Sequence, residues 1–179
     1  MAPMRVAFVA AGRIDPAGGK HIVPAFQPLV ERQARRHEVI VHALEPGETG
    51  DQCAALVERA TRGKAIDIVH AYGAGPGSVA TLAARTLRVP SVVTLDAGEF
   101  VAMPDIGYGL QARWRSRRDV LSTMQRATRL TVCSRYQQGL ARIPGGHPEV
   151  IPLGVDTGFF RPASQAAAPE TALPSRSFR

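Results

Sequence analysis

The stretch "IDIVHAYGAGPGSVATLAARTLRVPSVVTL", residues 66–95, decides the fold class of this 179-residue chain. It starts with an apolar run at 66–71, continues with apolar residues at helical spacing over 78–88, and ends with a second apolar run at 91–95. Two apolar runs joined by a helix predict neighbouring parallel strands. Both runs are nearly uninterrupted rather than alternating, so helices are expected to cover both faces of the sheet.

The same alternation continues on both sides of this stretch. Further strands are predicted at 5–11, 38–43, 130–133 and 149–151. Further helices are predicted at 24–36, 52–62, 110–127 and 135–141. With six strands and five helices in alternation, the sequence predicts a single α/β domain. Its expected architecture is a Rossmann-like, doubly wound parallel sheet with helices on both faces.

The charge balance of the chain is basic. The formal net charge is +7, and arginine supplies almost all of the positive charge, because Lys20 and Lys64 are the only lysines. Such a balance is compatible with phosphate-bearing partners, namely nucleotides, nucleic acid or an anionic membrane surface. A codon bias that favours alanine, arginine and glycine explains the composition equally well.

Signals for export, membrane insertion and metal binding are weak in this sequence. The apolar run 6–11 is too short for the central region of a signal peptide, and a first buried strand explains it better. No stretch approaches the length of a membrane span, so the expected location is the cytoplasm. Cys53 and Cys133 are too few and too isolated for a disulfide framework or a zinc site. Residues 163–179 have no periodicity and predict a linker or a disordered tail.

The loop after the first predicted strand contains two adjacent glycines. In a doubly wound sheet, ligands bind at the carboxyl ends of the strands. Gly18 and Gly19 stand just before a predicted helix, where backbone N–H groups can bind a phosphate. A phosphate-binding Walker A loop is excluded, because Ile14 replaces its first glycine and His21 replaces its serine or threonine. A simple turn is the alternative.

The loop after the third predicted strand imitates a dinucleotide-binding motif. Gly73, Gly75 and Gly77 follow a strand, and Asp96 ends the next strand about twenty residues later. The last glycine position of that motif is Ser78, and the motif follows the third strand rather than the first. An NAD(P)-binding protein is therefore the less favoured interpretation.

An acidic loop follows the fourth predicted strand. It carries Asp96, Glu99, Asp105 and Tyr108 among glycines. Carboxylates at the ligand-binding edge suit recognition of sugar hydroxyl groups or a general-base role. A metal site is less well supported, since no histidine joins the set, and a solvated loop is the alternative.

Three other residues lie at strand ends. Ser134 follows the fifth predicted strand as a helix N-cap, with Arg135 beside it. His70, near the end of the third strand, either reaches the ligand cleft or is a buried imidazole with internal hydrogen bonds. The lone His37 and His42 offer no nucleophile or metal partner pattern, and no catalytic triad is evident from the sequence.

The predicted helix 110–127 is basic and amphipathic. Four residues form its apolar stripe: Leu110, Trp114, Leu121 and Met124. Six arginines occupy much of the remainder of this helix or follow directly after it: Arg113, Arg115, Arg117, Arg118, Arg126 and Arg129. This pattern suits contact with an anionic membrane surface, or a core-facing stripe opposite a solvated charged face.

Five segments together resemble the N-terminal domain of GT-B glycosyltransferases of the family 4 type. These are "RVAFVAAGRIDPAGGKH" (5–21), "RRHEVIVHAL" (35–44), "IDIVHAYG" (66–73), "LTVCSRY" (130–136) and "IPLGVDTGFFRP" (151–162). The last segment is the most specific, and the resemblance covers about residues 4–162. It implies two Rossmann-like domains facing each other across a cleft, the first binding acceptor and the second a nucleotide-sugar. Sugar transfer would retain the anomeric configuration and need no metal or other cofactor.

The resemblance also implies positions for site residues. Gly18 and Gly19 would lie beside the donor diphosphate, the loop 96–108 would shape the acceptor site, and Ser134 and Arg135 would lie nearby. Family members often have a histidine just after the fourth strand, where this chain has Asp96. No catalytic residue is therefore assigned.

The expected division places the acceptor-side domain at 1–152 and a hinge motif with a tail at 153–179. The donor-binding domain is expected to be absent, because no two glutamates stand eight positions apart. We expect an incomplete retaining glycosyltransferase whose partners are a nucleotide-sugar, a carbohydrate or lipid-linked acceptor, and a missing domain or second chain. Peripheral contact with the inner face of an anionic membrane is one interpretation of the basic helix, and nucleic acid is not an expected partner. The alternative is a non-catalytic module that binds a sugar, a nucleotide or a partner chain.

Overall fold

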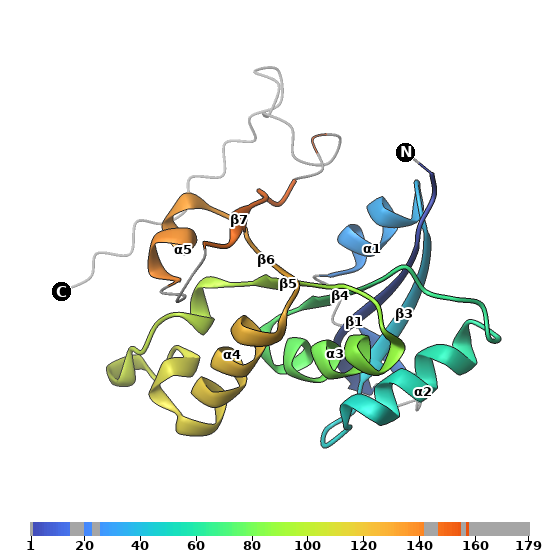
Figure 1. Cartoon of the computed structure of the whole chain (residues 1–179). Coiled ribbons are helices and arrows are strands. Elements are labelled where there is room, and N and C mark those ends of the chain that lie inside the picture. Colours follow the sequence, from blue (N-terminus) through green and yellow to red (C-terminus); the bar gives the residue numbers. More distant parts are fainter. Residues whose placement is uncertain (1, 15–19, 23–25, 142–146, 155–156, 158–179) are drawn as a thin grey trace, which may run out of the picture.

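The computed structural model of the chain describes residues 2–14, 20–22, 26–141, 147–154 and 157. These residues form one sheet with helices on both of its faces (Figure 1). Gly18 and Gly19 and most of the segment 151–162 lie outside the described residues.

Six parallel strands make up the body of the sheet. In spatial order they are β3 (Glu38–Leu44), β1 (Arg5–Ile14), β4 (Ile68–Tyr72), β5 (Ser91–Leu95), β6 (Arg129–Val132) and β7 (Glu149–Val150). Val6 of β1 is in register with Val39 on one side and Ile68 on the other. The predicted parallel sheet is confirmed. The chain moves outward from β1 to β3 and then returns past β1 to β4, which creates the switch point where such sheets bind ligands.

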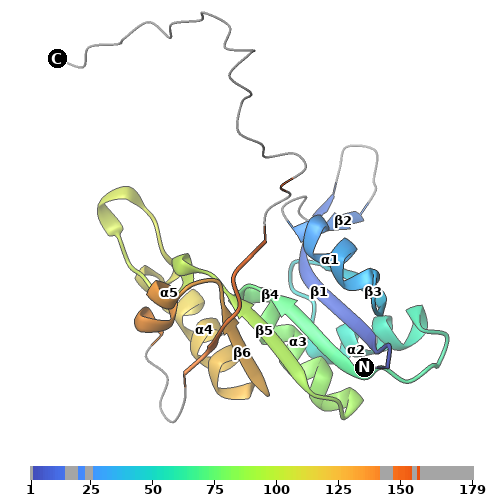
Figure 2. The ribbon, with the colours of Figure 1, turned by 90° about the horizontal axis from the view of Figure 1, so that it is seen from above.

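Helices cover the two faces of the sheet unequally. The helix α1 (Gln27–Ala34) lies over one face, whereas α2 (Gly50–Ala60), α3 (Ala74–Leu87) and α4 (Trp114–Arg126) cover the other (Figure 1). The short helix α5 (Arg135–Leu140) follows β6 at the carboxyl edge of the sheet (Figure 2). The doubly wound arrangement with helices on both faces is thus confirmed.

The main hydrophobic core lies between the sheet and the helices α2, α3 and α4. Strand residues in this core include Val9, Ala71, Val93, Leu95 and Val132. Burying a valine or leucine side chain contributes about 1.5–3 kcal/mol, so this face supplies much of the folding free energy. The opposite face is more polar, and there Phe8 packs edge-on against His70 with ring centroids 5.2 Å apart.

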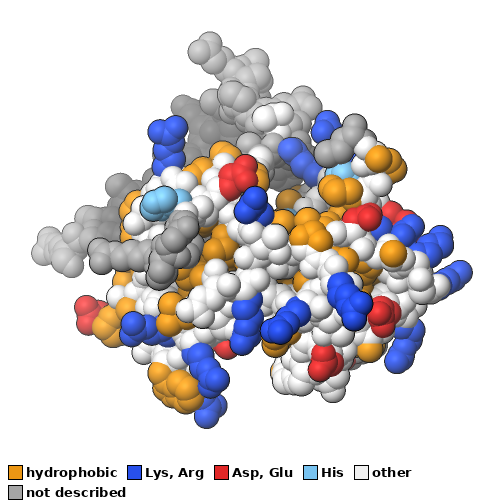
Figure 3. Space-filling view, viewed as in Figure 1, with side chains coloured by type: hydrophobic (Ala, Val, Ile, Leu, Met, Phe, Trp, Pro, Cys, Tyr) orange, Lys and Arg blue, Asp and Glu red, His pale blue; other side chains and the backbone are white. Residues whose placement is uncertain are grey.

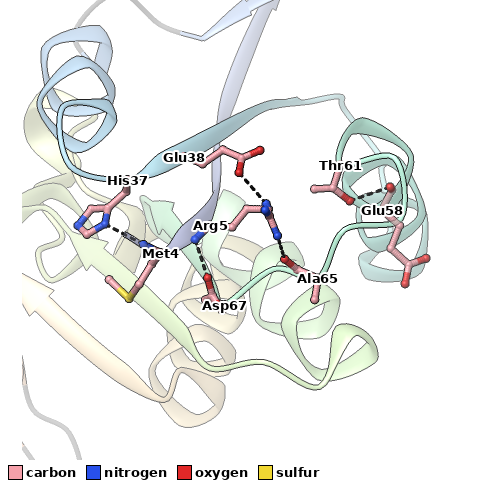
Figure 4. Close-up of polar contacts among 8 residues, drawn as sticks. All are labelled: Met4, Arg5, His37, Glu38, Glu58, Thr61, Ala65 and Asp67. Atoms are coloured by element: carbon pink, nitrogen blue, oxygen red, sulfur yellow. Dashed lines mark hydrogen bonds and ion pairs between the residues drawn. The ribbon is translucent and has the colours of Figure 1, made fainter. Parts of the chain in front are cut away.

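The amino edge of the sheet is held by Arg5 (Figure 4). Its backbone N–H donates to Asp67 Oδ2 at 2.6 Å, and its guanidinium Nε donates to Glu38 Oε2 at 2.9 Å. A second guanidinium nitrogen donates to the carbonyl oxygen of Ala65. These contacts join the beginnings of β1 and β3 to the segment before β4, at the edge opposite the expected ligand site.

The structure differs from the predicted loop after β1. The strand β1 continues to Ile14 and pairs antiparallel with β2 (Lys20–Ile22), and α1 begins only at Gln27. The prediction that the glycine pair directly precedes a helix is therefore wrong, because β2 intervenes. A strand of three residues has no apolar periodicity from which it could have been predicted.

The glycine-rich segment after β4 is helical rather than a loop. Helix α3 begins at Ala74, not at residue 78 as predicted, and includes Gly75 and Gly77. A Cβ on Gly77 would lie 2.7 Å from Thr123 Cγ2, so this glycine allows α3 to approach α4 closely. Glycine is a weak helix former, which explains why the sequence predicted the helix to begin only at residue 78.

The predicted helix 110–127 is broken near its beginning. A single 3₁₀ turn, Leu110–Ala112, is followed by Arg113 in an extended conformation, and α4 begins at Trp114. Met124 is buried, but Trp114 and Leu121 are 68% and 44% exposed. The predicted stripe therefore faces the core only in part.

Candidate functional site

Polar residues from several loops meet at the carboxyl edge of the sheet. Asp96 directly follows β5, and Ser134 lies two residues after the end of β6. Because β5 and β6 are parallel neighbours, their following residues lie at the same edge. The structure thus brings together two of the predicted site residues from separate loops.

Gln137 of α5 connects these two strand ends. Its side-chain Nε2 donates to Asp96 Oδ1 at 2.9 Å, and its Oε1 accepts from the backbone N–H of Cys133 at 2.6 Å. Its own backbone N–H donates to Ser134 Oγ, the N-cap of α5, at 3.2 Å. The side chain is almost fully buried, so it fixes the orientation of the exposed Asp96 carboxylate. Sequence reasoning missed Gln137, although a serine followed three residues later by glutamine is a helix-start pattern.

Glu99 is a buried carboxylate that accepts hydrogen bonds from two backbone N–H groups. Its Oε1 accepts a hydrogen bond from the backbone N–H of Ala74, at the beginning of α3. Its Oε2 accepts from the backbone N–H of Asp96 at 2.7 Å. Burial raises the pKa of Glu99 to about 7, although both N–H bonds act in the opposite direction.

The position of Glu99 bears on the dinucleotide motif considered above. A dinucleotide would place its pyrophosphate at the beginning of the helix that follows the glycines. In this chain that helix is α3, and its first N–H group is bonded to the Glu99 carboxylate. This geometry speaks against the NAD(P)-binding interpretation.

His70 belongs to a row of polar side chains beneath α1. Gln33 Nε2 of α1 lies 2.7 Å from His70 Nδ1, and His70 Nε2 lies 3.0 Å from Thr94 Oγ1. The Thr94 hydroxyl in turn lies 2.7 Å from Thr131 Oγ1, so the row crosses β4, β5 and β6. Burial lowers the pKa of His70 to about 4 and keeps the imidazole neutral. Among the described residues, the buried Gln33 Oε1 has no hydrogen-bond partner.

The remaining predicted site residues are exposed. Tyr108 pairs with Met103 through two backbone hydrogen bonds of 2.8 and 3.0 Å, which close the acidic loop into a hairpin-like turn. Its hydroxyl lies 3.1 Å from the position that a Cβ on Gly98 would take. Asp105 lies in the exposed turn between Met103 and Tyr108, and Arg135 is exposed at the beginning of α5. The structure therefore connects Asp96, Glu99 and Ser134 but leaves Asp105 at the tip of the loop.

Metal-ligating side chains do not gather in the acidic loop. In the described part of the chain, the group of three such side chains that lies closest together is elsewhere, at the end of β3. The carboxyl edge of β5 and β6 thus offers carboxylate, hydroxyl and guanidinium groups, which can bind the hydroxyl and phosphate groups of a ligand.

Comparison with known proteins identifies the family. A family model described as Glycosyltransferase Family 4 matches residues 50–159, which is more than half of the chain. The chain belongs to glycosyltransferase family 4. The family 4 match runs from α2 to beyond β7 and includes the whole edge formed by Asp96, Glu99, Ser134 and Gln137. No curated protein sequence matches the chain.

Solved structures show the same fold for this family 4 chain. Two crystal structures of Anabaena Alr3699/HepE, one in complex with UDP and one with UDP and glucose, each align with a TM-score of 0.50. Sequence identity is 16% and 17%, and each alignment covers 87% of this chain. It covers 45% and 46% of the HepE chains, so this chain spans less than half of their length. The likeness supports a Rossmann-like domain that corresponds to one part of a GT-B structure.

Proposed function

We propose that this chain forms the acceptor-side half of a retaining glycosyltransferase. The enzyme would transfer a sugar from a nucleotide-sugar to a carbohydrate or lipid-linked acceptor. The observation that carries the proposal is the overlap of the family 4 match with the carboxyl edge that holds Asp96 and Ser134. The UDP complexes of the structural neighbour support a nucleotide-sugar as the donor.

Asp96 is the residue best placed to bind the acceptor. Its carboxylate is exposed, and Ala97 N–H and the Gln137 amide orient it through Oδ1. A carboxylate held in this way accepts hydrogen bonds from sugar hydroxyl groups and can take up a proton from one of them. We therefore propose acceptor recognition at Asp96, with the exposed turn around Asp105 and Tyr108 shaping the rest of this site.

Arg135 is the residue best placed to meet a phosphate. It is exposed at the beginning of α5, directly after the N-cap Ser134. A guanidinium group forms charge-assisted hydrogen bonds with phosphate oxygens, and such groups stabilise a departing diphosphate in the transition state. In this proposal cationic side chains and backbone N–H groups neutralise the diphosphate, Gly18 and Gly19 remain candidates for its binding, and transfer requires no metal.

A polypeptide of these 179 residues alone is expected to show negligible sugar transfer. The physical reason is that transfer needs a closed cleft with acceptor and donor sites on facing domains, and the chain spans less than half of HepE. The measurement is release of nucleoside diphosphate from UDP-sugars and GDP-sugars in the presence of sugar or lipid-linked acceptors. Robust transfer by the polypeptide alone would contradict the proposal that donor binding requires a second domain.

A non-catalytic binding module is the second candidate, because the carboxylate, hydroxyl and guanidinium groups at the carboxyl edge can bind a sugar or a nucleotide without any chemical step. Ligand binding separates the candidates, since a ligand that binds only the folded state raises the melting temperature. Stabilisation by UDP or GDP and by their sugars supports a nucleotide-sugar protein, whereas a shift with NAD(P) alone would overturn the transferase proposal. Activity gained on adding a donor-binding domain would favour the enzyme over the binding module.

We also propose that α4 contacts an anionic membrane surface. Trp114 and Leu121 are exposed on this helix, and together with Arg117, Arg118 and Arg126 they line a shallow hollow of about 400 Å³. Figure 3 shows blue basic side chains beside orange apolar ones at the lower left, where Figure 1 places α4. Apolar side chains flanked by arginines are typical of interfacial helices. No helix in the described part of the chain has the length and apolar character that crossing a membrane requires.

Removing arginines from α4 should weaken binding to anionic vesicles. Each arginine near an anionic surface contributes about 1 kcal/mol, so the double variant Arg117→Gln/Arg118→Gln should bind roughly 10- to 30-fold more weakly. The measurement is co-sedimentation with vesicles that contain phosphatidylserine or only phosphatidylcholine. The control Arg35→Gln/Arg36→Gln removes two exposed charges just after α1 and should bind like the wild type. Equal losses in both variants would indicate attraction by net charge rather than by α4.

A further inference from the structure

Three side chains of different chemistry meet where β3 leads into α2. His42 lies on β3, Glu48 lies in the connecting loop, and Cys53 lies in the first turns of α2. Their ligand atoms all lie within 4.8 Å of one another, and His42 Nε2 is 2.6 Å from Glu48 Oε1. A strand, a loop and a helix therefore each supply one metal-ligating group to the same place.

These three side chains are withdrawn from solvent. The side chains of His42 and Glu48 are 15% and 5% exposed, and Cys53 is fully buried. Burying a carboxylate is costly unless a cation or hydrogen-bond donors compensate it. Here the Glu48 carboxylate is compensated by the Glu45 N–H, by His42 and by the Cys53 thiol. An imidazole, a carboxylate and a thiol in one place are also typical ligands of a transition metal.

The surrounding backbone holds the three groups in place. Glu48 Oε2 accepts a hydrogen bond from the Glu45 backbone N–H at 3.1 Å, which orients the carboxylate. Thr49 and Gln52 form a reciprocal capping box that fixes the first turn of α2 just before Cys53. Such supporting hydrogen bonds are what orient the ligands in metal sites.

We propose that His42, Glu48 and Cys53 bind one zinc ion. Zinc prefers nitrogen, oxygen and sulfur ligands in tetrahedral geometry, in which neighbouring ligand atoms are about 3.3–3.6 Å apart. The present ligand atoms are between 2.6 Å and at most 4.8 Å apart, a range that includes this spacing. The thiolate and imidazole ligands disfavour magnesium and calcium, which require oxygen ligands.

The fourth zinc ligand would be a water molecule. Glu48 lines a hollow of about 490 Å³ whose wall also includes Gln52 and Arg59 of α2, so solvent can approach the site. When zinc binds, the Cys53 thiol loses its proton to solvent and a zinc–sulfur bond forms. The hydrogen bond between His42 and Glu48 breaks, and both side chains turn their lone pairs to the metal. The ion would clamp β3 to α2, independently of sugar transfer at Asp96.

This proposal revises the expectation that two cysteines are too few for a zinc site. It also revises the expectation that His42 has no metal partner. The fold adds Glu48, five positions before Cys53, and His42, six positions before Glu48. Their spacing matches none of the short zinc-binding motifs, so the sequence alone gave no indication of the site.

Titration of zinc into the chelator-treated full chain tests the proposal. Calorimetry should give one zinc ion per chain, with a higher melting temperature in its presence. Since loss of a mere supporting residue weakens a metal site by about 10- to 100-fold, Cys53→Ser and Glu48→Gln should weaken binding at least about 10-fold. The matched controls Cys133→Ser and His37→Gln, which replace the same residue types elsewhere, should bind zinc like the wild type.

Cobalt provides a second readout of the cysteine ligand. Cobalt(II) in the same site should show a thiolate-to-metal absorption band that Cys53→Ser abolishes and Cys133→Ser retains. Absence of saturable zinc binding, or unchanged affinity in Cys53→Ser, would overturn the proposal. Should Cys53→Ser not fold, His42→Gln provides the same comparison at a less deeply buried position. None of these measurements involves nucleotide or sugar, so their outcome is separate from that of the transferase proposal.

Discussion

Replacing Gly77 by alanine should lower the free energy of unfolding by about 1–3 kcal/mol, the usual effect of overpacking a core. A Cβ at this position would lie 2.7 Å from Thr123 Cγ2 and 2.8 Å from Val93 Cγ1. Thr123 is fully buried, and its hydroxyl donates to the carbonyl oxygen of Ala74 at 2.9 Å, so it has little freedom to move. Urea denaturation followed by circular dichroism measures the effect.

Gly75→Ala is the matched control for this prediction. Gly75 lies in the same turn of α3, but a Cβ there would meet no atom within 4 Å. Alanine favours the helix over glycine by about 0.5–1 kcal/mol, so this variant should be as stable as the wild type or slightly more stable. If both variants behaved alike, the close approach of α3 to α4 would not be the reason for Gly77.

Glu99→Ala should cost about 2–4 kcal/mol of stability. The substitution removes the acceptor for two backbone N–H groups, those of Ala74 and Asp96, and a buried unsatisfied donor costs about 1–3 kcal/mol. Asp105→Ala, at an exposed position of the same loop, should change stability by no more than about 0.5 kcal/mol. Thermal and urea unfolding of the two variants provide the comparison, and equal effects would contradict the role of Glu99 as a cap.

The same carboxyl group should make stability depend on pH. The pKa of Glu99 is about 7 in the folded chain and 4.5 when unperturbed, so between these values the folded state holds a proton that the unfolded state has released. Its contribution to stability therefore falls as pH rises from about 4.5 to 7, by up to about 3 kcal/mol. His70, with its pKa lowered to about 4, acts in the opposite direction over pH 4 to 6.5. Measuring the free energy of unfolding of the wild type and of Glu99→Gln across this pH range isolates the contribution of Glu99. If the two proteins showed the same dependence on pH, the predicted role of Glu99 would be contradicted.

The fold was largely predictable because the buried strands appear in the sequence as short, mainly apolar runs. Continuous apolar runs such as 91–95 can be buried on both faces only by helices, so the parallel sheet followed from them. The hairpin with β2 and the early start of α3 at Ala74 were not predictable, because three residues carry no period and glycines weaken the helical signal. In these places tertiary contacts determine the local structure.

The candidate site was predictable only in outline. Asp96 and Ser134 were expected at the carboxyl edge of the sheet because they follow strands, and the structure places them at that edge. The connection through Gln137 and the burial of Glu99 depend on how α3 and α5 meet the strand ends. The burial of Met124 but not of Trp114 likewise depends on the break at Arg113, which the spacing of apolar residues does not reveal.

Gln137 makes the orientation of Asp96 depend on α5, the shortest α-helix among the described residues. Helix α5 has only six residues, and helices this short do not hold together without tertiary contacts. Local opening of α5 would release Asp96 and the Cys133 N–H in a single step, while the sheet beneath stays intact. The geometry of the Asp96 carboxylate therefore depends on the folded state of α5 as well as on the sheet.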